Sequence, residues 1–449
     1  MTRTSGIASC SSRCQGARPP APRYLVLLLL ALCGCKNGDG GAGPGREQGV
    51  PPPSCTGAHP TSQAYVTGTQ LFPIPAIPPP GKCLVVEDPV FKTRVSRVTD
   101  RDQDGYNEEA ILNHYSKADY ENSDGTRVLL LTPRSMVWHL YDTTSFGRVK
   151  TVALGSSSQP EPRWDDTDPS LLYYVDGMRL MTVNVSSGQR ATIRDFSGDV
   201  PGARTIGTAV EGDASVDRDR WCFMARDSGD SVLAVLAFDR PENAVIGKKT
   251  TEIDPSIDWV GTSPSGRHCV IGSDSGTVAY PVGFGKSVKM PPGANGHADL
   301  ALTKGGRDVL VYQNNDTDWI AMADLDTGAE TNLVRIPFTT NSDIGLHFSG
   351  NCARTPGWLL VSTYGRKEPS GSPSWMDQHL FMVELEPEAR VWRVASTYSY
   401  MGDYWAEAFA SVNRAGTRVY WGSNWGQASL DRIETFVALL PIGWPGQVP

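Results

Sequence analysis

Residues 167–188 read TDPSLLYYVDGMRLMTVNVSSG. Two short segments rich in aromatic, β-branched and other apolar residues lie on either side of Asp176-Gly177, and turn-forming residues flank the whole stretch. Short apolar runs bounded by turn residues are typical of β-strands, and an Asp-Gly pair between two such runs is typical of a tight hairpin. The stretch therefore predicts two antiparallel strands joined by a two-residue turn.

The same pattern of turn, strand, strand and turn recurs along the chain at intervals of about 40 to 60 residues. No long window shows the 3.6-residue apolar period of a helix. Four-stranded sheets of this length, arranged radially, form a β-propeller. We therefore predict an all-β, seven-bladed β-propeller over residues 91–449, with two stacked sandwiches as the structural alternative. The units are residues 123–142, 167–188, 217–239, 264–282, 304–328, 354–387 and 414–441.

The closure of the ring is predicted from an incomplete last repeat. The final unit ends with FVALLP (436–441), its third strand, and lacks a fourth. Residues 91–99 (FKTRVSRVT) are strand-like and belong to no unit. We expect this N-terminal strand to pair in the last blade, because a closed ring leaves no exposed sheet edge between the first and last blades.

The N-terminus predicts export. Residues 1–34 contain four arginines, no acidic residue and the apolar run YLVLLLLAL (24–32), as in a secretory signal peptide. The run is shorter than the roughly 20 residues that a membrane-spanning helix needs. LCGC (32–35) resembles the bacterial lipobox, which implies acylation of Cys35; the alternative is an ordinary signal peptide with a chance cysteine. We predict a lipoprotein of the bacterial cell envelope, in the periplasm or on the cell surface, that contacts the membrane only through its anchor.

Residues 35–90 connect the predicted anchor to the repeats. They are rich in Gly and Pro (GDGGAGPG, VPPPS, FPIPAIPPPG), a composition that buries little apolar surface and predicts an extended tether. Disulfides persist outside the cytoplasm. Cys55–Cys83 would fix this segment and Cys222–Cys269 would join neighbouring repeats, although sequence alone does not determine the connectivity.

The charge excludes one class of partner. Residues 1–34 contain four of the 41 basic residues, so the chain without them carries a net charge of −12 against its 49 acidic residues. This balance argues against a nucleic-acid partner, which requires a basic face, and disfavours loose attraction to polyanionic sugars. The absence of a phosphate loop, a GxSxG elbow and an HExxH motif disfavours NTPases, α/β-hydrolases and zincin proteases.

The stretch DRDQDGYNEE (100–109) combines alternating aspartates with a glycine. Calcium takes six to eight oxygen ligands, and alternate carboxylates in a tight loop can converge on one ion. The stretch resembles the DxDxDGxx[D/E] calcium loop of integrin-type propeller repeats, and also the first half of an EF-hand, from which it departs at Ile111. The resemblance implies a structural calcium site; the alternative is an acidic surface turn. The implied ligands are Asp100, Asp102, Asp104, the backbone carbonyl of Tyr106, and Glu108.

The innermost strand of each blade should precede the turn of its repeat and line the central channel. Histidines and carboxylates that converge there can bind a divalent metal or act as a general base. For each histidine the alternative is a hydrogen bond at a strand end. We take Glu211 and Glu407 as catalytic candidates and Arg163 as a ligand-binding candidate. The full set near these strands is His114, Glu161, Arg163, Glu211, Asp258, His297, Asp299, His347 and Glu407.

The repeat order resembles the oligogalacturonate lyase type of propeller. The segments that carry the resemblance are RVTD (97–100), NHYSKADYENSDGTRVLL (113–130), LYYVDGMRLMTVNVSSG (172–188), GHADLALTKGGRDVLVY (296–312) and LHFSG (346–350).

The resemblance implies β-elimination on uronates and a divalent metal in the central channel. It implies His297 and His347 as metal ligands and His114 as the base. The last blade departs from the pattern, because related repeats often read PHASV where this chain reads AFASV, with Phe409 in the place of the histidine. Loss of one ligand weakens a multi-histidine metal site.

Aromatic residues are frequent in the last two repeats. The stretch YSYMGDYWAE (398–407) precedes the last inner strand, so we expect Tyr404 and Trp405 to overhang the channel. Exposed flat rings there would stack on sugar rings or peptide side chains. The alternative is packing between blades. The residues in question are Trp375, Trp392, Tyr398, Tyr400, Tyr404, Trp405, Trp421 and Trp425.

Two functions remain in competition. The first is a propeller that binds a saccharide in a top-face pocket, with altered or degenerate lyase chemistry. The second is a non-catalytic scaffold for envelope proteins, which predicts that His297 and His347 are buried and individually hydrogen-bonded. Fold alone does not decide between them.

Overall fold

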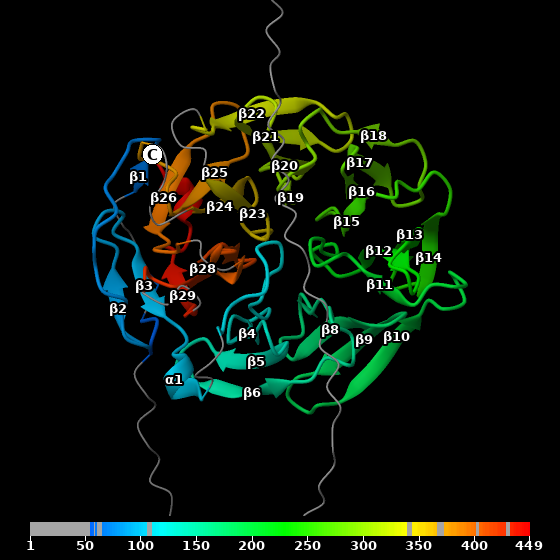
Figure 1. The fold of residues 1–449 in the computed structure, drawn as a ribbon, viewed down its shortest axis with the longest axis horizontal. Helices are drawn as coiled ribbons and strands as arrows, with labels where there is room; N and C mark the ends of the chain where they lie inside the picture. The colour runs from blue at the N-terminus through cyan, green and yellow to red at the C-terminus, as the bar shows by residue number, and fades with distance from the viewer. Residues whose placement is uncertain are drawn as a thin grey trace, which may run out of the picture. The chain divides into compact units, whose positions relative to one another are not determined.

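The computed structural model describes residues 54–449 except 58, 61–64, 106–109, 339–343, 366–371, 401–403 and 428–431. Seven antiparallel sheets are arranged in a ring (Figure 1), which confirms the predicted seven-bladed β-propeller. The described helices are short: α1 (Arg101–Asp104), η1 (Tyr404–Ala406) and η2 (Trp444–Gly446). None of them is long and apolar enough to cross a membrane.

The first four blades follow the predicted repeats. In the first blade the inner position is taken by an irregular stretch that joins β4 through isolated bridges at Leu112 and Glu121. The strands are β4 (Arg127–Thr132), β5 (Val137–Asp142), β6 (Arg148–Val152), β7 (Arg163–Trp164), β8 (Leu171–Asp176), β9 (Arg179–Asn184), β10 (Arg190–Asp195), β11 (Thr205–Gly207), β12 (Arg220–Arg226), β13 (Val232–Asp239), β14 (Ala244–Lys249), β15 (Ile257–Thr262), β16 (His268–Ser273), β17 (Gly276–Pro281) and β18 (Val288–Lys289).

The last two of the remaining three blades include strands from the N-terminal segment. The sixth sheet gains one strand and the seventh gains two strands from residues that precede the repeats. The strands are β19 (Ala298–Leu302), β20 (Asp308–Asn314), β21 (Trp319–Asp324) and β22 (Glu330–Arg335) in the fifth blade, β23 (Gly345–Ser349), β24 (Trp358–Tyr364), β25 (His379–Glu384), β26 (Val391–Ser396) and β1 (Val66–Thr67) in the sixth, and β27 (Ser411–Val412), β28 (Arg418–Ser423), β29 (Glu434–Leu439), β3 (Arg94–Arg97) and β2 (Val85–Glu87) in the seventh.

The ring closes as predicted. Strand β3 pairs antiparallel with β29, in a register that places Arg97 opposite Phe436 and Arg94 opposite Leu439. Residues from the two ends of the chain therefore share one sheet (Figure 1). The pairing covers the backbone groups of β29 that would otherwise form an open edge.

The propeller begins earlier in the chain than predicted. Residues 65–90, which we call the strap, were expected to be part of an extended tether, yet β1 pairs with β26 and β2 pairs with β3. The two strands are short, and the surrounding Gly- and Pro-rich composition predicted an extended tether in their place. The predicted signal peptide, Cys35 and the glycine-rich stretch that follows lie outside the described residues.

The core lies between neighbouring blades. The central residues of β8, LYYV at 172–175, are all buried, because a middle strand packs against a blade on each face. This two-sided burial explains why such segments read as continuous apolar runs. The disulfide Cys222–Cys269 joins β12 to β16 across the third and fourth blades, and Cys55–Cys83 is also formed, so both candidate pairings are confirmed.

Candidate functional site

Inner residues of three blades meet in one group of side chains. His297 precedes β19, His347 lies in β23, and Glu407 precedes β27. The two imidazole rings are 5.1 Å apart between centroids, and His347 Nε2 is 3.1 Å from Glu407 Oε2. These three residues, together with Glu211 and Lys117, are called the entry cluster.

Burial sets the charge of the entry cluster. It lowers the pKa of His347 to about 3 and the pKa of His297 to about 4, so both imidazoles are uncharged at neutral pH. Burial also raises the pKa of Glu407 to about 7. When Glu407 is protonated, the hydrogen bond between Glu407 and His347 therefore joins two uncharged groups.

A lysine that sequence reasoning missed joins the cluster. Lys117 Nζ lies 2.8 Å from Glu211 Oε2 and 4.8 Å from the centre of the Trp259 ring. Burial is the largest single effect and opposes ionisation of Glu211, but the charge and hydrogen bond of Lys117, together with smaller effects of His297 and His347, lower the pKa of the carboxyl. Lys117 lies in NHYSKADY, three residues after His114. No motif around it indicates that it binds a carboxylate, so there was no reason to select it from the sequence.

Aromatic rings surround the two histidines. Phe409 is fully buried and packs with its ring centre 4.5 Å from that of His347, and the Tyr364 ring stacks on His347 at 5.0 Å. Ala408 and Phe409 both have positive φ, at 66° and 42°, a conformation that non-glycine residues adopt at a cost. Tyr404 remains 54% exposed, and the charge of Glu407 contributes to raising its pKa after the larger effect of burial.

The side chains of the entry cluster do not fit a metal. Phe409 stands where the family resemblance places a further histidine, and it packs against His347. Glu211 is ion-paired with Lys117, whose ammonium group would also repel a dication. Among the described residues, no three His, Cys, Asp or Glu side chains are grouped as a metal site.

Two predicted residues lie outside the entry cluster. His114 packs against Trp405 at 5.9 Å and Trp138 at 5.7 Å, and burial, aided by the charge of Arg163, lowers its pKa to about 4. Arg163, predicted to bind ligand, is instead held by protein groups: its Nε lies 2.9 Å from Asp213 and its Nη2 donates to the Gly212 carbonyl.

Arg163 belongs to a second group of charges further along the inner strands. Asp213 Oδ1 accepts from Arg163 and also from Arg218, whose Nη1 lies 2.8 Å away. Arg414 contacts Asp119, whose pKa burial raises to about 7. These five residues are called the axial network. A cavity of about 40 Å³ beside them is lined in part by Lys117 and Asp299, and it has room for water but not for a sugar.

The other inner carboxylates have ordinary structural partners or face solvent. Glu161 accepts the backbone N–H groups of Thr208 and Val210. Asp299 accepts those of Leu300 and Gly350, and Asp258 is exposed. Glu161 and Asp299 thus organise the inner strands, while Asp258 interacts with the entry cluster through the charges of Glu211 and Lys117, and Asp299 through that of Lys117.

The first part of the acidic stretch forms a short helix, α1, where the sequence predicts a tight loop. Asp100 caps α1 by accepting from the Gln103 N–H, and Gly105 ends the helix with φ 82°. Asp102 pairs with Arg432 at 2.7 Å and Asp104 pairs with Lys82. The basic side chains of Arg432 and Lys82 thus balance the charges of Asp102 and Asp104, for which the sequence predicts a calcium ion. Tyr106 and Glu108 lie outside the described residues, so the calcium site stays a prediction.

Most of the predicted aromatic residues are packing residues. Trp375, Trp392, Tyr398, Trp421 and Trp425 are buried. Of the aromatic stretch, Tyr404 alone is markedly exposed among the described residues, and Trp405 is half-buried beside it. The stacking surface is therefore much smaller than the sequence suggested.

The ring of seven sheets gives the class of the protein as a seven-bladed β-propeller, whereas no family model and no curated protein matches the chain. Oligogalacturonate lyase in complex with manganese aligns with a TM-score of 0.56 and 15% identity, covering 80% of this chain and 96% of that one. The oligogalacturonate lyase of Vibrio parahaemolyticus gives 0.55 and 13%, with the same coverage. At these identities the likeness shows a shared fold.

Proposed function

We propose that the protein is a lipid-anchored, extracytoplasmic β-propeller that binds a saccharide at the entry cluster without a bound metal. The observation that carries the proposal is an exposed ring near a histidine that lacks a hydrogen-bond partner. Tyr404 is exposed beside Glu407, and the His297 imidazole has no hydrogen-bond partner within the part of the chain that the structure describes. Such groups suit a ligand that offers both a flat face and hydroxyls.

The uncharged imidazoles support this chemistry. A neutral imidazole has one donor and one acceptor nitrogen, and a carboxyl with a pKa near 7 can donate or accept, so each can pair with a sugar hydroxyl. Glu407, with a pKa near 7, can take up or release a proton at neutral pH, and the neutral His297 imidazole can act as an acceptor. Lyase-like chemistry would therefore rest on His297 and Glu407, with Lys117 as the nearby positive charge.

The test is calorimetric titration with neutral and uronic oligosaccharides in buffer that contains a chelator. We expect wild type to bind at least one member, Tyr404→Ala to bind it at least tenfold more weakly, and Tyr404→Phe to retain most of the affinity. Absorbance of the unsaturated product reports elimination on uronates. Failure to bind any member of the panel would reject the proposal.

The role of metal is tested separately. Manganese should leave the affinity of wild type unchanged, because Phe409 blocks the place of a further histidine ligand. Phe409→His introduces that ligand and is the variant expected to take up manganese, measured by elemental analysis after dialysis. Stoichiometric manganese in wild type that is lost in His297→Ala would show that the site is metal-dependent.

A non-catalytic scaffold is the second candidate. One observation favours it: His347 is buried and hydrogen-bonded to Glu407, as that hypothesis predicts. It differs from the first in requiring a protein partner and no sugar. Photocrosslinking from position 442, where Ile442 is 69% exposed, compared with a buried control position, would identify such a partner.

A further inference from the structure

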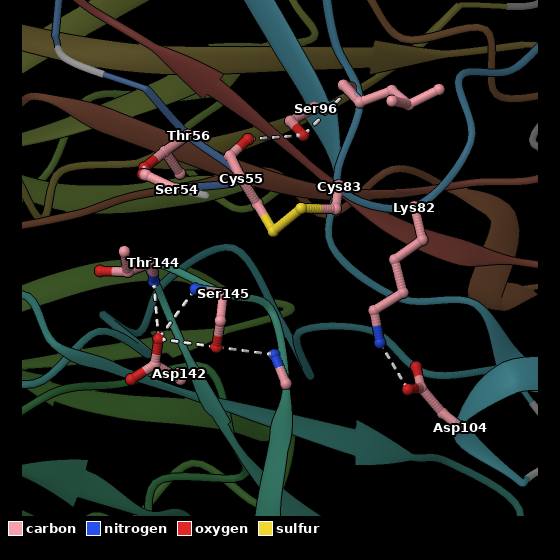
Figure 2. Close-up of a disulfide and its surroundings, with 12 residues drawn as sticks. Ser54, Cys55, Thr56, Lys82, Cys83, Ser96, Asp104, Asp142, Thr144 and Ser145 are labelled. Atoms are coloured by element: carbon pink, nitrogen blue, oxygen red, sulfur yellow. Dashed lines mark hydrogen bonds and ion pairs between the residues drawn. A yellow bond between two sulfur atoms is a disulfide. The ribbon is translucent and has the colours of Figure 1, made fainter. Parts of the chain in front are cut away.

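The strap crosses the place where the ring closes. Figure 2 shows the Cys55–Cys83 disulfide between the closing strand and the first blade. Cys55 N donates to the Thr144 carbonyl in the first blade at 2.7 Å. Ser96 Oγ, from β3 of the seventh blade, donates to the Cys55 carbonyl at 3.2 Å and to the Leu84 carbonyl at 3.1 Å. The disulfide therefore connects the strap to the first and the seventh blades, which meet where the ring closes; this junction is called the seam.

The residue next to the disulfide makes a second connection. Lys82 pairs with Asp104 at the end of α1, and both side chains are largely buried, at 12% and 6% exposure. Lys82 Nζ also lies 5.5 Å from the centre of the Tyr141 ring in β5. After burial, the charge of Asp104 is the next cause that raises the pKa of Tyr141. Two consecutive strap residues thus hold the seam, as seen in Figure 2.

The remainder of the strap depends on the last two blades. Its β2 strand extends the seventh sheet, and Trp425 Nε1 donates to the Ile77 carbonyl at 3.0 Å. Its β1 strand extends the sixth sheet, where Tyr65 packs on Trp392 at 5.1 Å. One segment therefore bridges three successive blades at the place where β3 closes the ring.

The two disulfides differ in access. Cys222 and Cys269 are 1% and 0% exposed between two blades. Cys55 is also buried, at 2% exposure, but Cys83 is half-buried in the turn before β2 and has φ 67°, a left-handed conformation that is strained for a residue other than glycine. Accessible disulfides held in strained surroundings are the ones most readily reduced.

We propose that Cys55–Cys83 is a reducible latch on the closure of the propeller. A thiolate attacks Cys83 Sγ, the bond between the two cysteine sulfurs breaks, and Cys55 leaves as a thiolate that is then protonated. A second thiol resolves the mixed disulfide. Overall, two small-molecule thiols are oxidised to one disulfide while Cys55 and Cys83 each become a thiol. Reduction releases the strap from the first blade and loosens β3 and α1. This inference goes beyond ligand binding and does not depend on it.

The experiment uses the whole folded chain, titrated with dithiothreitol and followed by differential alkylation and mass spectrometry. We expect Cys55 and Cys83 to be labelled at a reductant concentration at least tenfold lower than Cys222 and Cys269. Hydrogen exchange on the half-reduced protein should rise at 82–104 and remain unchanged in β12 and β16. Simultaneous reduction, the opposite order, or unchanged exchange at 82–104 would each overturn the latch.

Variants provide an independent check. The double variant C55S/C83S should reproduce the increased exchange at 82–104 and lower the melting temperature. The matched control C222S/C269S should increase exchange at β12 and β16 and leave the seam protected. Lys82→Ala should make Cys55–Cys83 reducible at lower reductant, since it removes the neighbouring connection to α1. A Lys82→Ala protein with an unchanged reduction midpoint would contradict the joint role of the two residues.

Discussion

The entry cluster and the axial network contain the same kinds of side chain but treat charge differently. In the axial network Asp213 accepts from both Arg163 and Arg218, at 2.9 and 2.8 Å. In the entry cluster His297 has no hydrogen-bond partner among the described residues, and Tyr404 beside Glu407 is exposed. Asp213 and its two arginines thus form their hydrogen bonds within the protein, whereas His297 does not have such a partner among the described residues.

The difference separates structural from functional residues. A buried ion pair in which every charged group has a partner holds inner strands together. Removal of one member leaves the other as a buried charge without a partner, which is costly. A buried polar group without a partner costs stability, so its persistence points to a ligand. By this criterion Arg163 is structural and His297 is a candidate for function. Glu407 is hydrogen-bonded to His347, and it is a candidate because it lies beside the exposed Tyr404. The predictions below test the distinction in order of expected effect.

Removal of Asp213 should give the largest loss of stability. Asp213→Ala leaves Arg163 and Arg218 buried without their shared carboxylate, and breaking such a pair costs about 3–5 kcal/mol. The measurement is the free energy of unfolding in urea. Asp258→Ala, an exposed carboxylate of another inner strand, is the control and should stay within about 0.5 kcal/mol. Equal losses in the two variants would erase the distinction between the two groups.

Glu407 should make the protein less stable as the pH rises. Its pKa is about 7 in the folded chain and about 4.5 when unfolded, so between these values the folded state holds a proton that the unfolded state has released. Stability therefore falls from pH 4.5 to 7 and then levels, by about 3 kcal/mol for this group. Glu407→Gln should lack this part of the slope.

The control for Glu407 lies in the same molecule. Burial also raises the pKa of Asp119 and Asp299 to about 7, so both contribute a slope of the same sign in wild type and variant. The difference between the two stability profiles isolates Glu407. Parallel profiles would show that Glu407 is ionised at neutral pH, and the contrast with the axial network would then fail.

The fold could be predicted because it is repeated and local. Each hairpin carries its own turn and apolar runs, and the unpaired strand at 91–99 required a partner in the last blade. The strap was missed because β1 and β2 are two and three residues long within a segment dominated by Gly and Pro. Their pairing depends on strands several hundred residues away, which no local pattern records.

The candidate site was predicted only in part. The positions of His297, His347, Glu211 and Glu407 follow from repeat geometry, and they do meet. The partners of each charge do not follow from it. Lys117 reaches Glu211 from an irregular stretch, and Arg163 turns to Asp213 of the next blade. Side-chain pairing across blades depends on rotamers that sequence spacing cannot specify.

Tyr404 and His297 should affect ligand affinity more than stability. Loss of a stacking ring or of one hydrogen bond to a bound sugar costs about 1–2 kcal/mol, equivalent to roughly a tenfold change in Kd. Tyr404 is 54% exposed, so Tyr404→Ala should leave the free energy of unfolding nearly unchanged. Calorimetry and urea unfolding on the same preparation measure both. A large stability loss with unchanged affinity would place Tyr404 with the packing residues.

Asp102 should show the smallest effect in calcium-free buffer. Its pair with Arg432 is exposed, with side chains at 59% and 42%, and exposed pairs contribute about 0–1 kcal/mol. Asp102→Ala should therefore unfold at nearly the wild-type urea concentration when a chelator is present. Calcium gives the decisive comparison: a rise in the wild-type melting temperature that Asp102→Ala lacks would show that the ion displaces Arg432 and binds the acidic stretch. Identical behaviour with and without calcium would show that basic side chains alone balance α1, as the axial arginines balance Asp213.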